Sequence, residues 1–208
     1  MPDYKLEQTA IDEGYTTIAG VDEVGQGPWA GPVMAGAAIL DVEQVPDDLL
    51  HALDDSKKLK PARRAELHDR LKTTPGVMLG IGLASVEEID DINILQAALL
   101  AMGRAVANLP EPPSFALVDG NKPPALDCPV RCVVKGDAIS FSIAAASIAA
   151  KVTRDVLMTQ LDAQYPGYGW SSNAGYGTPE HQLGLKRLGV TLHHRRSFKP
   201  IKLLLEGA

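Results

Sequence analysis

Four acidic side chains stand where apolar, strand-like runs of the sequence end: Asp22, Glu23, Asp119 and Asp137. The sites of open α/β sheets gather beyond strand ends, so three neighbouring strands could bring these carboxylates together. Close carboxylates repel one another, and protonation or a metal cation must relieve the repulsion. Ligand sets made only of oxygen suit Mg²⁺ or Mn²⁺. Because two such ions roughly 4 Å apart are the usual device for in-line phosphoryl displacement, the pattern predicts a two-metal site in which one ion activates water and the other stabilises the leaving oxygen.

Each acid taken alone also has a simpler interpretation. Residues 119–121, Asp-Gly-Asn, are typical of a turn. Asp137 would favour the start of the helix expected after it. Asp22 and Glu23 are neighbours, so a regular strand would turn them to opposite faces and leave one of them solvated. Only the joint placement of the acids favours the metal site.

The turn after the first two acids allows a rival hypothesis. Residues 25–30, Gly-Gln-Gly-Pro-Trp-Ala, match the spacing G-x-G-x-x-A of a dinucleotide-binding turn. That motif must open a helix, but Pro28 and Pro32 fall in what would be its first turns. Two carboxylates would also face the pyrophosphate. The sequence therefore favours strand, turn and strand here over a dinucleotide-binding oxidoreductase.

The elements that must position the acids are strands mixed with helices. Apolar runs and turn residues predict two strands within residues 18–40, and further strands at 76–84, 115–118 and 130–134. Helices are expected from Pro61, from a capping box at 85–88 to about 109 with Asn93 as a second cap, over 139–164, and from 179 to 189. Residues 51–60 and 165–178 are expected to be loops, and 201–205 a short amphipathic tail. This order predicts an α/β or α+β fold with a mixed sheet.

Composition narrows the class of protein. The chain has 208 residues, of which 45% are hydrophobic and 22% charged, enough for one sizeable core. No apolar run nears the roughly 20 residues of a membrane span, and the start does not resemble a secretory signal, so we expect a soluble cytoplasmic protein. The net charge of −6 argues against nucleic-acid binding, but residues 1–104 carry −9 and residues 105–208 carry +3, a weak indication of an electrostatic face. Cys128 and Cys132 lack nearby zinc ligands and are expected to be free thiols.

Eight segments, in this order, resemble the ribonuclease HII family: IAGVDEVGQGPWAGPV, DDSKKL, NILQAALLAM, LVDGN, VVKGD, AASIAAKVTRD, GYGTPEH and HHRRSF. The resemblance spans about residues 19–202. It implies a ribonuclease H-like mixed β-sheet flanked by helices, with a catalytic domain at 1–164 and a C-terminal loop and helical substrate-binding segment at 165–208 that is not independent. It also implies hydrolysis of the RNA strand of RNA–DNA hybrids and incision of duplex DNA 5′ to embedded ribonucleotides, with Mg²⁺ or Mn²⁺. The products would carry 3′-hydroxyl and 5′-phosphate ends.

The resemblance assigns roles to individual residues. The family's four metal-binding acids fall on Asp22, Glu23, Asp119 and Asp137. Its Gly-Arg-Gly turn, which senses the ribose 2′-hydroxyl, falls on Gly25, Gln26 and Gly27, and its junction-sensing tyrosine falls on Tyr176. The candidate phosphate contacts are Ser56, Lys57, Lys58, Lys135, Arg195, Arg196 and Lys199.

The sequence departs from the family pattern close to the expected cleavage point. Gln26 stands where the family usually has arginine, and it cannot form a charge-assisted bond to phosphate. Ala174 and Gly177 replace a lysine and a proline of the family's tyrosine loop. We therefore expect weakened substrate binding with intact chemistry, in an enzyme that acts as a monomer. The alternative hypothesis is a non-catalytic module that binds metal and hybrid duplex.

Overall fold

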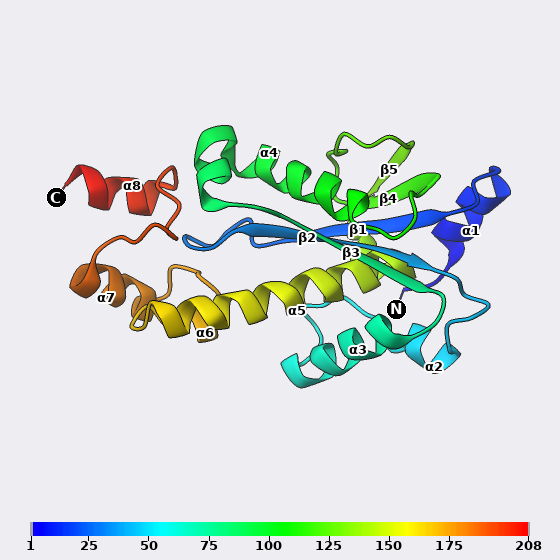
Figure 1. Ribbon diagram of the computed structural model, residues 1–208, viewed down its shortest axis with the longest axis horizontal. Helices are drawn as coiled ribbons and strands as arrows, with labels where there is room; N and C mark the ends of the chain where they lie inside the picture. Colours follow the sequence, from blue (N-terminus) through cyan, green and yellow to red (C-terminus); the bar gives the residue numbers. More distant parts are fainter. Residues whose placement is uncertain (1, 208) are drawn as a thin grey trace.

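The computed structural model describes residues 2–207, and its centre is a five-stranded mixed sheet in the order β3-β2-β1-β4-β5 (Figure 1). The strands are β1 (Ile18–Val24), β2 (Val33–Leu40), β3 (Val77–Ala84), β4 (Phe115–Asp119) and β5 (Val130–Val133). β2 is antiparallel to both β1 and β3, whereas β1, β4 and β5 run parallel. The predicted mixed sheet is confirmed.

Helices cover both faces of this sheet. They are α1 (Lys5–Asp12), α2 (Asp47–Leu50), α3 (Pro61–Thr73), α4 (Val86–Ala107), α5 (Phe141–Gln164), α6 (Trp170–Asn173), α7 (Pro179–Leu188) and α8 (Lys199–Glu206), with a short 3₁₀ turn, η1 (Gly136–Ala138). Figure 1 shows α4 on one face and α5 on the other, with α7 and α8 beyond one end of the sheet. The predicted capping box before α4 is present, and α4 breaks at Asn93, whose side chain accepts from the N–H groups of Leu95 and Gln96.

Two glycines let α5 lie directly on the sheet. A Cβ at Gly20 would lie 2.1 Å from the carbonyl carbon of Ser142, and one at Gly36 would lie 2.2 Å from the carbonyl oxygen of Ala146. Any side chain at either position would therefore push the helix away. Because side chains alternate along a strand, Asp22 lies on the same face of β1 as Gly20 and points toward α5.

The C-terminal segment shares a core with the rest of the chain. Trp170, Leu185 and Ile201 are buried in one cluster with Ala30, from the β1–β2 turn, and Met158, from α5. A single β-bridge also joins Ala30 to His194. Because of this shared core, we still expect residues 165–208 not to fold alone. In the described part of the chain, no helix is both long and apolar enough to cross a membrane.

Candidate active site

The register of the sheet places Asp22 beside Asp119. Val21 of β1 pairs with Val118 of parallel β4, so the next residues, Asp22 and Asp119, lie side by side toward the carboxyl ends of these strands. Asp137 lies in η1, which follows β5 at the same end of the sheet. The N–H of Gly136 in this turn donates to Asp119 Oδ1 at 2.6 Å. Three acids that are far apart in the sequence thus meet where the parallel strands end.

The acids affect one another's ionisation. Burial raises the pKa of Asp22 well above its usual value, and the charge of Glu23, followed by those of Asp119 and Asp137, raises it further against a hydrogen bond from Ser147. Asp22 is only 5% exposed. Burial also raises the pKa of Glu23, and the charge of Asp119 adds to this effect, although a hydrogen bond from Gln26 opposes it. The site therefore concentrates negative charge that the protein alone does not neutralise.

Lys57 is a basic side chain whose pKa is raised by the negative charge of these acids. Burial lowers the pKa of Lys57, but the charges of Asp22 and Asp137, joined by that of Asp55, outweigh burial and raise the pKa overall. The pKa of Asp137 is raised by burial and by Asp55 and Asp119, and Lys57 opposes that rise. One ammonium group facing several carboxylates leaves room for further positive charge.

The donor set fits hydrated divalent cations. Among residues 2–207, no three Asp, Glu, His or Cys side chains converge closely enough to form a ready-made metal cage. Mg²⁺ does not need such a cage, because it keeps several waters and is usually held by one or two carboxylates together with substrate phosphates. A donor set made only of carboxylate oxygens, in which burial and like charges raise the pKa values of Asp22, Glu23 and Asp137, suits this mode of binding.

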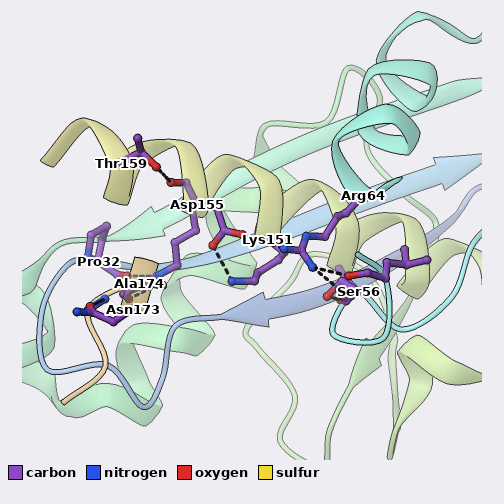
Figure 2. Close-up of polar contacts among 12 residues, drawn as sticks. Pro32, Ser56, Arg64, Lys151, Asp155, Thr159, Asn173 and Ala174 are labelled. Carbon is purple, nitrogen blue, oxygen red and sulfur yellow. Dashed lines mark hydrogen bonds and ion pairs between the residues drawn. The ribbon is translucent and has the colours of Figure 1, made fainter. Parts of the chain in front are cut away.

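A hydrogen-bond network holds the loop that carries Lys57. The Oγ atoms of Ser56 and Ser147 lie 2.8 Å apart, and Arg64 Nη1 donates to the Ser56 carbonyl at 2.6 Å. Arg64 also pairs with Asp155 of α5 at 3.1 Å, and Lys151 pairs with the other oxygen of Asp155 at 2.6 Å (Figure 2). Ser56 is buried, so it supports the loop from within, while Lys57 and Lys58 are exposed.

The turn formed by Gly25, Gln26 and Gly27, called here the 25–27 turn, lies next to the acids and to Tyr176. Gln26 is exposed, and its Nε2 donates to Glu23 Oε1 at 2.6 Å. A Cβ at Gly27 would lie 3.1 Å from the ring of Tyr176, which is itself 51% exposed. The structure thus brings together the two segments that the resemblance assigned to recognition of the sugar.

Arg195 does not lie where the sequence suggested. It is fully buried, and its guanidinium donates to the carbonyls of Gly25, Gln26 and Gly31 at 2.6, 2.9 and 2.9 Å. The prediction that Arg195 is a phosphate contact is therefore wrong, because its side chain is buried and points inward beneath the 25–27 turn. Arg196 is exposed, as are Lys135 and Lys199.

Sequence reasoning missed Arg154. This residue of α5 is 1% exposed and donates to three carbonyls around the same turn. A signal was available: Ser147, Arg154, Met158 and Leu161 recur at helical spacing on the buried side of α5. A basic residue on that stripe indicates a buried guanidinium.

Comparisons with known proteins agree with the fold and the motifs. The family model for ribonuclease HII matches residues 19–201. Ribonuclease HII of Rhodospirillum rubrum is 56% identical over 202 residues, 97% of this chain and 91% of that protein. That of Paramagnetospirillum magneticum is 57% identical over 201 residues, 97% of each chain.

Solved structures are similar as well. The ribonuclease H2 from Pyrococcus horikoshii superposes with a TM-score of 0.76 at 28% identity, covering 92% of this chain and 98% of that one. A Bst-RNase HIII solved in complex with Mn²⁺ has a TM-score of 0.69 at 20% identity, over 96% of this chain and 72% of that one, and so shows the fold alone. Since the family model covers most of the sequence and the curated relatives are more than half identical over nearly its whole length, the chain belongs to the ribonuclease HII family.

Proposed function

We propose that this member of the ribonuclease HII family hydrolyses the RNA strand of RNA–DNA hybrids and incises duplex DNA 5′ to an embedded ribonucleotide, leaving 3′-hydroxyl and 5′-phosphate ends. Family membership makes the chain a ribonuclease, a hydrolase that acts on phosphodiester bonds. The finer proposal depends on one observation: Asp22 and Asp119 lie side by side at the carboxyl ends of β1 and β4, and Asp137 joins them from η1.

The four acids have distinct roles in this proposal. Asp22, Asp119 and Asp137 would hold two divalent cations, Mg²⁺ or Mn²⁺, and Glu23 would hold the second cation or orient the attacking water. Bound cations would lower the pKa of the water and neutralise charge on the leaving oxygen. Burial of Asp22 excludes bulk water, which strengthens every electrostatic interaction at that carboxylate.

The segments around the acids would bind the nucleic acid. The backbone of the 25–27 turn would meet the ribose 2′-hydroxyl, and the exposed ring of Tyr176 would pack on the next sugar, where a second 2′-hydroxyl would be crowded. Lys57, Lys58 and Arg196 are exposed and would contact phosphates, which gives affinity without sequence preference. We predict that a single copy of the chain suffices.

The test uses end-labelled duplex DNA that contains one ribonucleotide, incubated with Mg²⁺, Mn²⁺ or EDTA. We expect a single metal-dependent nick 5′ to the ribonucleotide, no cleavage of an all-DNA duplex, and loss of the nick in Asp22→Asn. A folded wild-type protein that binds a hybrid but cleaves neither substrate in a single turnover would contradict the proposal. It would favour the non-catalytic module instead.

A further inference from the structure

Two buried arginines lie beneath the 25–27 turn without a carboxylate partner. Arg154 is 1% exposed and Arg195 is fully buried, yet within residues 2–207 neither guanidinium forms an ion pair. The nearest acids that influence them are engaged elsewhere: Asp155 pairs with Arg64 and Lys151, and Asp90 accepts the N–H groups of residues 196 and 197. Burying an unpaired charge is costly, so hydrogen bonds must compensate for it.

The hydrogen bonds that the two side chains donate all go to backbone carbonyls. Arg195 binds the carbonyls of Gly25, Gln26 and Gly31. Arg154 binds those of Ala30, Pro32 and Ala174 at 3.3, 3.0 and 3.0 Å. Figure 2 shows Pro32 and Ala174 side by side at this contact. Six carbonyls thus join the β1–β2 turn to the loop that carries Tyr176.

The carbonyls of Gly25 and Gln26 belong to the peptide groups whose N–H groups are those of Gln26 and Gly27. Both of these residues are exposed, and in the described chain neither N–H donates to a protein acceptor. Hydrogen bonds in a chain polarise one another, so a cation bound to a carbonyl makes the N–H of the same peptide group a stronger donor. Arg195 acts on both peptide groups at once, at 2.6 and 2.9 Å.

Gly25 leaves the space that Arg154 occupies. Gly25 has φ +93°, and a Cβ there would lie 2.3 Å from Arg154 Nε. Gly31 has φ +81°, and a Cβ there would lie 2.4 Å from the sulfur of Met158 and at an ordinary contact distance, 3.4 Å, from Arg154 Nη2. The ring of Phe198 covers the guanidinium of Arg195, whose Cζ lies 5.1 Å from the ring centroid. The pair is therefore enclosed by the turn above and by C-terminal residues below.

We propose that Arg195 and Arg154 are positioning residues for the ribose-sensing turn: they hold its two free N–H groups toward the substrate and supply, from beneath, positive charge that the exposed Gln26 does not carry. The inference rests on the proposed function of the turn. Burial lowers the pKa of Arg195 to about 9 and that of Arg154 to about 10, so both side chains stay charged at neutral pH.

The experiment compares Arg195→Met, Arg195→Lys and Arg154→Lys with a control, Lys72→Gln, which removes an exposed basic side chain from the last turn of α3. Circular dichroism and thermal unfolding establish that each variant folds. Amide ¹H–¹⁵N spectra without substrate report on the N–H groups of Gln26 and Gly27. Fluorescence anisotropy in EDTA then measures affinity for a ribonucleotide-containing duplex, and the nicking assay separates KM from kcat.

We expect Arg195→Met to raise KM by about 10- to 100-fold, the effect of losing a charge-assisted hydrogen bond, and to shift the amide signals of Gln26 and Gly27 upfield. Arg195→Lys keeps the positive charge but cannot bind three carbonyls at once, so its KM should lie between those of the wild type and Arg195→Met. If Arg195→Met does not fold, Arg195→Lys still tests whether Arg195 positions the turn. Arg154→Lys should also raise KM, and Lys72→Gln should match the wild type.

Two outcomes separate this inference from the proposed function. Folded Arg195 variants with unshifted amide signals and an unchanged KM would overturn the inference while leaving the nuclease proposal intact. If the wild type neither binds nor cleaves the duplex, the proposed function fails. The amide signals of Gln26 and Gly27 would then still show whether Arg195 organises the turn.

Discussion

Replacing Gly25 with alanine tests how tightly the 25–27 turn is built onto Arg154. Two effects oppose the substitution. The backbone at Gly25 has φ +93°, a conformation that costs a residue with a Cβ about 1–2 kcal/mol. The new Cβ would also lie 2.3 Å from Arg154 Nε and 2.9 Å from its Cδ, so the buried side chain must move.

The magnitude follows from what Arg154 would lose. Moving its Nε weakens the hydrogen bond to the Pro32 carbonyl, 3.0 Å long, and each hydrogen bond to a charged group contributes about 1.5–3 kcal/mol. Together with the backbone cost, we expect Gly25→Ala to lower the free energy of unfolding by about 2.5–5 kcal/mol. A domain of ordinary stability, about 5–15 kcal/mol, would still fold in the cold.

Gly14→Ala is the matched control. Gly14 has φ +101°, but a Cβ there would meet no atom within 4 Å, so only the backbone cost of about 1–2 kcal/mol remains. Urea unfolding gives both values, and the nicking assay gives KM. We expect Gly25→Ala to raise KM and Gly14→Ala to leave it unchanged. Equal losses of stability in the two variants, with equal KM, would refute the claim that Arg154 supports the turn.

Three further predictions concern charge. Asp22→Asn should abolish nicking yet raise Tm at neutral pH without metal, by about 2–4 °C per kcal/mol regained, because burial and like charges raise the pKa of Asp22. Scanning calorimetry should show that the stability advantage of the variant over the wild type grows as pH rises above the ordinary carboxyl range. His181 and His194 are buried with their Nε2 atoms 3.0 Å apart, and the pKa of His194 is lowered to about 3, so the stability that neutral His194 contributes above about pH 6.5 should be lost as pH falls, by up to about 1.4 kcal/mol per unit. Urea unfolding should therefore show a smaller destabilisation by His194→Gln at pH 5 than at pH 7, and equal destabilisations would contradict this. Gln26→Arg should lower KM several-fold at low salt and steepen the salt dependence of binding by about one phosphate contact, and anisotropy titrations at three salt concentrations that showed parallel slopes would argue against it.

Much of the fold could be predicted because local signals agreed with tertiary structure. All five strands of the described sheet, the capping box and the break at Asn93 have local causes, and the acids at strand ends follow from the sheet's topology. α1 (Lys5–Asp12) was not predicted, because it is short and polar. It is anchored by Glu7, whose Oε1 accepts hydrogen bonds from Ser140 and Ser142, contacts that only the folded chain creates.

The site shows where sequence reasoning stops. Adjacent arginines at 195 and 196 have the same charge and the same neighbours in sequence, yet one is buried and the other exposed. The bridge between Ala30 and His194 sets which of them turns inward, and no local pattern specifies that long-range pairing. By contrast, the burial of Arg154 could have been predicted from the sequence, because Arg154 falls at helical spacing among the residues that form the buried face of α5.

The carbonyl contacts of Arg195 also determine the order in which parts of the site can form while the chain is being synthesised. The 25–27 turn is synthesised before Arg195, and the guanidinium that completes it is added 168 to 170 residues later, after the five strands of the described sheet have been made. Contacts of such large separation form late, because chain entropy must be lost before they are gained. A ribosome-bound chain that has not reached residue 195 would therefore carry the acids without a finished substrate turn, so its carboxylates would be assembled before it could choose a ribonucleotide to cut.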